Sequence, residues 1–110
     1  MKDLEIIRVI GKEAAIALAE EFAGTRLYIP ANVGDDHPIT AAIGREAADK
    51  LCAHYSPTTI CVPLLREARA VHHRCKGLSH AKIAVRLGVT EKAIERIFLR
   101  RRQREGVTSQ

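Results

Sequence analysis

The first half of the chain contains an internal repeat, which restricts the possible folds more than any other feature of the sequence. Residues 3–30 align without a gap with residues 36–63 at an offset of 33, and ten aligned pairs are identical. These include an Ile-Gly pair in each copy and the prolines that close both segments, Pro30 and Pro63. Similarity at a fixed spacing is the signature of a repeated structural unit. Two copies of one supersecondary unit are therefore expected in residues 1–63.

Each copy begins with the pattern of an amphipathic helix. In the first copy, apolar residues recur at spacings of three and four over residues 7–22, as they do on one face of a helix. Gly11 and Gly44 occur near the middle of the two segments, where glycine disfavours a helix by about 1 kcal/mol relative to alanine. We expect a bend or a break at these glycines. Asp3 and Asp36 are the candidate N-caps.

A short segment with the composition of a β-strand follows each helix. These segments, residues 25–29 and 58–62, are β-prone and each is followed by proline. Two strands are only marginally stable in water, so they need each other or the same strands of a second chain. A lobe of about 60 residues also buries little apolar surface alone. We expect an intertwined homodimer, with a monomeric lobe as the alternative. Its predicted interface residues are Ile7, Ile10, Leu18, Leu27, Ile29, Leu51, Ile60 and Val62.

The charges of the chain are unevenly distributed. Residues 1–63 contain six basic and nine acidic side chains, a net charge of −3. Residues 64–110 contain twelve basic and four acidic side chains, a net charge of +8, and the two values give the net +5 of the whole chain. A basic half beside an acidic one favours a polyanionic partner for the basic half. A solvated surface with no partner has the same composition and stays an alternative.

Residues 79–99 have the pattern of two helices joined by a tight turn. Ser79 and Thr90 stand where helix N-caps are needed. Gly88 lies between the two helices, where a left-handed backbone conformation is readily adopted only by glycine. The apolar residues expected to hold the two helices together are Ile83, Ala84, Leu87, Val89, Ile94, Ile97 and Phe98.

The preceding residues complete a small domain. Residues 64–76 carry a further apolar stripe and are expected to form a supporting helix. The expected domain covers residues 64–106, and residues 107–110 would form a flexible tail. The predicted fold class is therefore mainly α. An N-terminal dimerisation lobe of two helix-strand repeats in residues 1–63, with short β-strands, precedes a C-terminal three-helix helix-turn-helix domain.

The helix-turn-helix pattern and the basic charge together favour binding to double-stranded DNA. In such motifs the N-terminal residues of the second helix contact base edges in the major groove. Lysine and arginine can donate to guanine, and glutamate can accept from a cytosine amine. Ion pairing within the helix is the alternative role of these side chains. The candidate base contacts are Thr90, Glu91, Lys92, Glu95 and Arg96. The candidate phosphate contacts are Arg66, Arg69, Ser79, Lys82, Arg86, Arg100, Arg101 and Arg102.

Other classes of function are disfavoured. The three cysteines form no CxxC motif and are expected to be small apolar residues in a reducing cytosol. A metal site of His72, His73, Cys75 and His80 is a weaker alternative, because a helix directs the first three to different sides. There is no Gly-rich phosphate loop or nucleophile motif, so we expect no enzyme, no cofactor and no small-molecule substrate. Without an apolar run or a signal peptide, the expected location is the cytoplasm, in association with the nucleoid.

Taken together, these segments resemble the Mor transcription activators, a family of phage middle-operon activators and their prophage relatives. The resemblance covers nearly the whole chain. It rests on GTRLYIP at residues 24–30, on the segment from His37 to Leu51 that contains AIGREAADKL, on the second strand ending at Pro63 and on the terminal helix-turn-helix. Residues 59–63 would form a hinge between domains, where Cys61 departs from the family pattern.

The resemblance implies an N-terminal dimerisation domain, a C-terminal DNA-binding domain and an imperfect dyad site upstream of a promoter. It also implies recruitment of RNA polymerase. The expected function is therefore that of a homodimeric transcription activator whose partners are double-stranded DNA, a second copy of the chain and RNA polymerase, with no membrane partner. A DNA-binding repressor or architectural adaptor is the first alternative. A protein-interaction module that does not bind DNA is the second.

Overall fold

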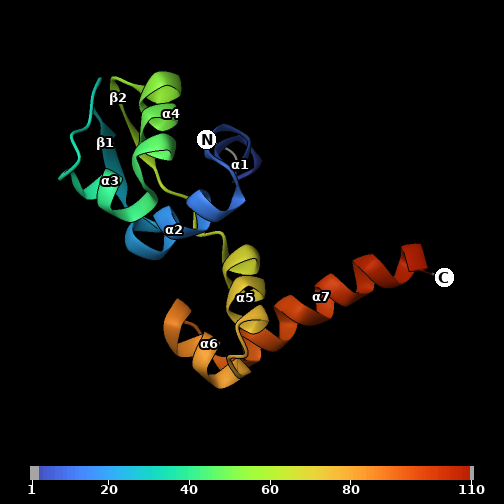
Figure 1. The fold of residues 1–110 in the computed structure, drawn as a ribbon. Coiled ribbons are helices and arrows are strands. Elements are labelled where there is room, and N and C mark those ends of the chain that lie inside the picture. The colour runs from blue at the N-terminus through green and yellow to red at the C-terminus, as the bar shows by residue number, and fades with distance from the viewer. Residues whose placement is uncertain (1–2, 110) are drawn as a thin grey trace. The chain divides into compact units, whose positions relative to one another are not determined.

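The computed structural model describes residues 3–109, which form seven helices and one two-stranded antiparallel sheet (Figure 1). The mainly helical fold class and the presence of two short strands are thus confirmed. The chain divides into two compact units, Met1–Leu65 and Arg66–Gln110. This boundary lies two residues after the predicted one. No helix within residues 3–109 has both the length and the apolar character needed to cross a membrane.

The first unit contains the two repeats, each folded as two helices and one strand. The first repeat forms α1 (Asp3–Ile10), α2 (Lys12–Phe22) and β1 (Arg26–Ile29). The second repeat forms α3 (Pro38–Ile43), α4 (Arg45–Tyr55) and β2 (Thr58–Cys61). The ends of α2 and α4 differ by the same 33 residues that separate the repeats in the sequence. The structural units therefore coincide with the sequence repeats.

Each predicted helix is broken at its glycine. Gly11 has φ 89° and ψ 158°, and Gly44 has φ 86° and ψ 163°. This backbone region is almost restricted to glycine, because a side chain there costs about 1–3 kcal/mol. Each glycine is the N-cap residue of the helix that follows it. A bend or a break was expected at each glycine. The structure has a break, so each repeat contains two short helices instead of one long helix.

The cap of α3 differs from the prediction. Its N-cap is His37, whose Nδ1 accepts a hydrogen bond from the N–H of Ile39 at 3.1 Å. The prediction of Asp36 as the cap is therefore wrong by one residue, because the imidazole supplies the acceptor that a carboxylate was expected to supply. Pro38 follows at the first helical position, where its missing N–H leaves no hydrogen bond unmade. The side chain of Asp3 lies outside the described residues.

The two strands pair with each other in an antiparallel sheet, and the pairing reveals an internal symmetry. Leu27 lies opposite Ile60, and these two residues are also equivalent positions of the two repeats. The helix contacts show the same symmetry. α1 of the first repeat packs against α4 of the second, and α3, the equivalent of α1, packs against α2, the equivalent of α4. A pseudo-two-fold axis therefore passes between Leu27 and Ile60 and relates the two repeats.

Most of the interface predicted between two chains is the core of one chain. Six of the eight predicted residues are at most 7% exposed: Ile10, Leu18, Ile29, Leu51, Ile60 and Val62. Only Ile7 and Leu27 are half-buried. In this structure the two repeats bury these six residues against each other within a single chain. Their role between the exchanged repeats of two chains stays a prediction.

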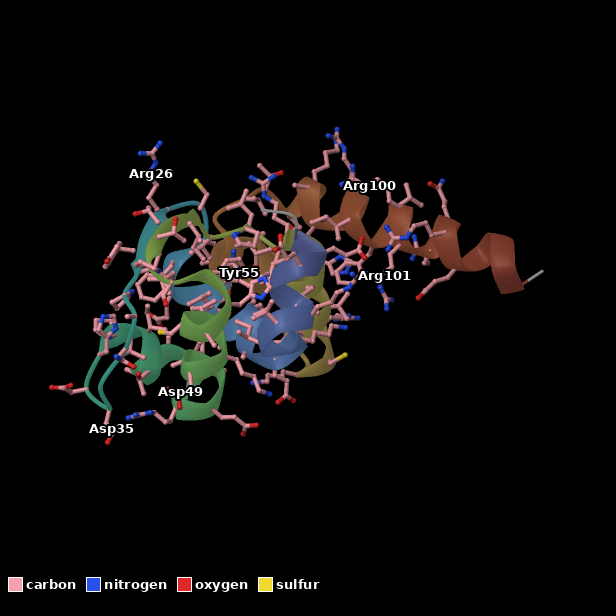
Figure 2. All side chains as sticks on the ribbon, turned by 90° about the horizontal axis from the view of Figure 1, so that it is seen from above. Arg26, Asp35, Asp49, Tyr55, Arg100 and Arg101 are labelled. Carbon is pink, nitrogen blue, oxygen red and sulfur yellow. The ribbon has the colours of Figure 1, made fainter. Side chains whose placement is uncertain are left out.

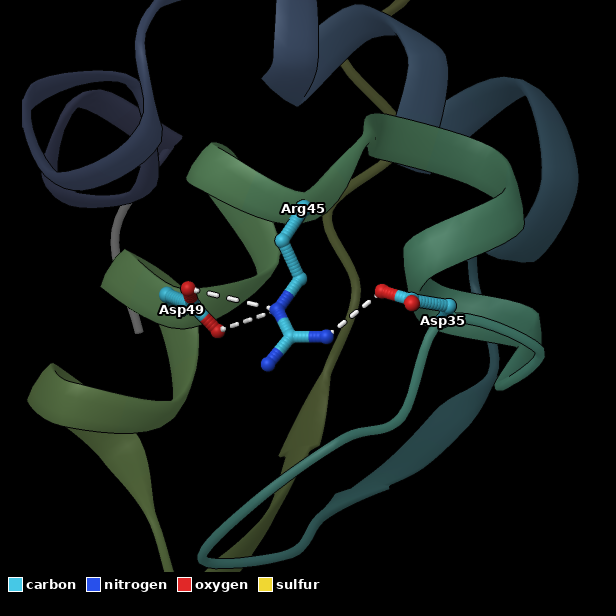
Figure 3. Close-up of polar contacts among 3 residues, drawn as sticks. All are labelled: Asp35, Arg45 and Asp49. Atoms are coloured by element: carbon cyan, nitrogen blue, oxygen red, sulfur yellow. Dashed lines mark hydrogen bonds and ion pairs between the residues drawn. The ribbon is translucent and has the colours of Figure 1, made fainter.

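An ion-pair cluster fixes the connection between the repeats to α4. Arg45 Nη1 lies 2.6 Å from Asp35 Oδ1, and Arg45 Nε lies 3.3 Å from Asp49 Oδ1 (Figure 3). The hydrogen bond to Asp35 and the charge of Asp49 raise the pKa of Arg45 above its ordinary value. All three side chains are exposed, so we expect the cluster to position the connection and to add little to stability.

The second unit contains three helices. These are α5 (Arg66–Cys75), α6 (His80–Leu87) and α7 (Glu91–Ser109). α5 packs against both α6 and α7, and α6 packs against α7. Leu65 has a φ of 47°, which no right-handed helix contains, so the supporting helix starts two residues later than predicted. Residues 107–109 are helical where a flexible tail was predicted, and Gln110 lies outside the described residues.

Candidate nucleic-acid interface

Local capping interactions position α6 and α7. Ser79 Oγ accepts a hydrogen bond from the N–H of Lys82 at 3.3 Å, at the start of α6. Thr90 Oγ1 accepts one from the N–H of Ala93 at 3.1 Å, at the start of α7. Gly88 ends α6 in the left-handed conformation, with φ 71° and ψ 31°. These three predictions are confirmed, and together they set the direction in which α7 leaves the turn.

A small apolar core holds the three helices of the second unit together. Ala84 is 5% exposed at the contact of α6 with α7, where a small side chain lets two helices approach. The buried residues of this core are Ala70, Ile83, Ala84, Ile94 and Ile97. Four half-buried side chains pack against them: Leu78, Leu87, Val89 and Phe98. The apolar residues predicted to join the two helices are thus all part of this core or in contact with it.

The candidate base contacts occupy the turn before α7 and its first two turns. All five are exposed, and Thr90 also serves as the cap. Lys92, Glu95 and Arg96 line one shallow hollow of about 430 Å³ together with Arg102. The structure therefore brings three cations and one carboxylate to a common exposed face of α7, which we call the reading face (Lys92, Glu95, Arg96, Leu99 and Arg102).

Leu99 was missed by the sequence analysis. It lines the same hollow and is 46% exposed. Its spacing of three from Arg96 and four from Glu95 was the signal that could have placed it on the reading face. An exposed apolar side chain at this position could contact a thymine methyl group. His80 stacks on Phe98 beside it, with ring centroids 5.1 Å apart, and links the start of α6 to α7.

Seven of the eight candidate phosphate contacts are accessible. Arg101 is half-buried, and the other six are exposed: Arg66, Ser79, Lys82, Arg86, Arg100 and Arg102. Arg69 is the exception, because it is only 6% exposed. Its prediction as a phosphate contact is wrong, since a DNA backbone reaches only groups at the surface. The side chains of Arg100 and Arg101 leave α7 in different directions (Figure 2).

Arginines also gather in a groove between the start of α5 and one side of α7. We call it the arginine groove; it has a volume of about 400 Å³. Its charged lining residues are Arg66, Glu67, Arg96, Arg100 and Arg104, and its apolar lining residues are Val89, Ala93 and Ile97. Arg96 lines both this groove and the reading face, so the two surfaces are continuous.

The carboxylate of the groove is bound to one of its arginines. Glu67 Oε2 accepts a hydrogen bond from Arg104 Nη2 at 2.5 Å, across 37 positions of sequence. This hydrogen bond, with the positive charges of Arg104, Arg101 and Arg100, lowers the pKa of Glu67 below its ordinary value. The basic run of residues 100–104, which includes Arg104, is suited to phosphates by its sequence, but Glu67 was not among the predicted site residues, because a contact between α5 and the later turns of α7 has no local sequence signal.

The alternative of a metal site gains no support. Among the side chains that the structure describes, no group of three or more His, Cys, Asp or Glu residues could hold a metal ion. His80 is stacked on Phe98, and His73 is 5% exposed.

Comparison of the chain with protein-family models, with curated proteins and with solved structures finds no match. The chemistry of the interface therefore has to be inferred from the geometry and charge of the second unit.

Proposed function

We propose that the chain is a sequence-specific DNA-binding protein that activates transcription as a homodimer at a dyad promoter site, where it recruits RNA polymerase. The observation that carries the proposal is the reading face, which presents Lys92, Glu95 and Arg96 on the helix that follows a capped tight turn. The surrounding residues 64–110 have a net charge of +8. The resemblance to the Mor family supports the activator role in particular.

The proposed contacts follow from the chemistry of each exposed group. The first turns of α7 enter the major groove, where Lys92 and Arg96 donate to guanine O6 and N7, and Glu95 accepts from a cytosine amine. Lys82 and Arg86 on α6 and Arg102 on α7 donate to phosphates, which positions the reading face without selecting a sequence. Each class of contact thus has its own residues and its own expected effect on specificity.

The homodimer is proposed from the symmetry of the first unit. The contacts of α1 with α4, of α2 with α3 and of β1 with β2 all join different repeats. One repeat can therefore make the same contacts with the other repeat of a second chain, which gives an intertwined dimer without any new interface. Two copies of α7 would then face half-sites about one helical turn of DNA apart, about 34–36 Å, or a multiple of this distance.

Light scattering on the full chain tests the dimer. At a concentration of tens of micromolar we expect the mass of two chains, because the exchanged repeats would hold the dimer together through the whole core of the first unit. The mass of one chain under these conditions would contradict the dimer. The mass of one chain would not contradict DNA binding by the reading face of a single chain.

Footprinting followed by transcription in vitro tests the function. On a promoter fragment obtained by selection for binding, we expect two protected half-sites and more transcript when the chain is added to RNA polymerase. Arg96→Ala should weaken binding to this site by about 10–100-fold, the contribution of a good contact between arginine and guanine, and should change binding to random duplex little.

Arg102→Ala is the matched control, because it removes an arginine from the same helix face. It should weaken binding to the selected site and to random duplex by the same factor, as expected for a phosphate contact. Equal losses on both duplexes for Arg96→Ala would contradict base reading by Arg96. Less transcript with the same footprint would indicate a repressor rather than an activator.

A further inference from the structure

The arginine groove holds more positive charge than its own carboxylate can neutralise. Four arginines line it, and Glu67 is its only acidic lining residue. Guanidinium groups form paired hydrogen bonds with carboxylates and with phosphates in the same planar geometry. A groove of this composition therefore remains suited to a second anion after Glu67 has bound Arg104.

The position of the groove matches that of a backbone-binding surface. Arg96, Arg100 and Arg104 recur every fourth residue, so they follow one side of α7 over about 12 Å. Arg96 belongs to the reading face as well. A duplex whose bases meet the reading face would thus bring its phosphates to the entrance of the groove.

The ion pair inside the groove is open to exchange. The side chain of Glu67 is 40% exposed and that of Arg104 is 63% exposed, so both are reached by water and by an incoming anion. Exposed ion pairs contribute little net stability, because water solvates the separated charges well. A phosphate could therefore replace the Glu67 carboxylate on Arg104 at small cost.

We propose that Glu67 occupies the arginine groove as an intramolecular substitute for a DNA phosphate, and that a backbone phosphate displaces it from Arg104 when the chain binds a duplex. This inference rests on the DNA-binding function proposed above and adds a regulatory contact to it. Glu67 then competes with the DNA and limits the affinity of the chain for all duplex sequences alike. The affinity for DNA is thereby held below the value that the arginines alone would give.

Two substitutions that break the same ion pair test the proposal. Glu67→Gln should bind both the selected site and a random duplex about three- to fivefold more tightly, since the competing charge is gone. Arg104→Gln should bind both duplexes more weakly by a similar factor, since a phosphate contact is lost. The slope of log K against log salt should stay the same for Glu67→Gln, which keeps the contact of Arg104 with a phosphate, and should become shallower by about 0.9 per protomer for Arg104→Gln, which loses it.

The pair Glu46 and Lys50 supplies matched controls. These residues form an ion pair of 3.5 Å on α4, in the other unit. Glu46→Gln and Lys50→Gln change the net charge as the test variants do, and each should shift DNA affinity by less than its counterpart. Fluorescence anisotropy with labelled duplexes measures all four variants, and circular dichroism verifies their helix content.

The results separate the proposal from its alternatives. Opposite shifts for Glu67→Gln and Arg104→Gln, each larger than its control, would support it. Losses of affinity in both variants would overturn it and assign the ion pair a purely structural role in holding α7 against α5. A shift in Glu67→Gln no larger than that in Glu46→Gln would also overturn it, while leaving the DNA-binding function intact. Failure of the unaltered chain to bind any duplex would overturn both.

Discussion

Raising the salt concentration from 50 to 200 mM should weaken the binding of this chain to its DNA site by about 10⁴-fold. Binding of a polyanion by cations releases condensed counterions, and log K falls by about 0.9 per neutralised phosphate for each unit of log salt. Lys82, Arg86, Arg100 and Arg102 are four of the exposed cations of the second unit. If each of these four neutralises one phosphate, a dimer would neutralise about eight phosphates and have a slope near −7, before the contact proposed for Arg104 is added.

Titration of salt against a labelled duplex measures this slope. A random duplex is the internal control, because phosphate contacts occur on any sequence and the slope should remain steep there. A flat response on both duplexes would contradict DNA binding through the basic second unit. It would instead favour the alternative in which the helix-turn-helix contacts another protein.

The second large effect is expected from Ile94→Ala, which should unfold the second unit and abolish DNA binding. Ile94 is 0% exposed and belongs to a core of only five buried residues. Truncation of a buried isoleucine costs about 2–5 kcal/mol. A domain of this size has a total stability of only about 2–7 kcal/mol, so most or all of it would be lost.

Urea denaturation, followed by circular dichroism and by the NMR signals of each unit, measures this effect. Val85→Ala is the matched control, because Val85 is 82% exposed on α6 of the same unit. It should change the free energy of unfolding by less than about 0.5 kcal/mol. Retention of the second unit's transition midpoint in Ile94→Ala would contradict the core described here.

The parts of the interface that depend on local chemistry were predictable from sequence. The caps Ser79 and Thr90 and the turn at Gly88 each depend on contacts within four residues, and all three are present as predicted. The breaks at Gly11 and Gly44 were predictable for the same reason, since a backbone conformation that other residues avoid belongs to the glycine itself.

Features that depend on distant contacts were not predictable. The apolar residues of the repeat indicate that the two copies need a partner surface, and the same pattern fits a partner in the same chain or in another. Arg69 was assigned to the surface because arginine is usually exposed, and tertiary packing placed it inside. The contact of Glu67 with Arg104 joins positions 37 residues apart, so only the packing of α5 against α7 brings them together.

The pseudo-two-fold axis between Leu27 and Ile60 has a consequence for how this protein can diverge. In a symmetric assembly of single repeats, a mutation changes every equivalent position at once. Fusion of two repeats into one reading frame removes that constraint, so symmetry-related positions evolve separately. Tyr28 and Cys61 are such equivalents, both exposed on the same face of the sheet. This face of the sheet therefore carries the phenol of Tyr28 at one position and the thiol of Cys61 at the equivalent position. The side chains differ in chemistry although the backbone is nearly symmetric.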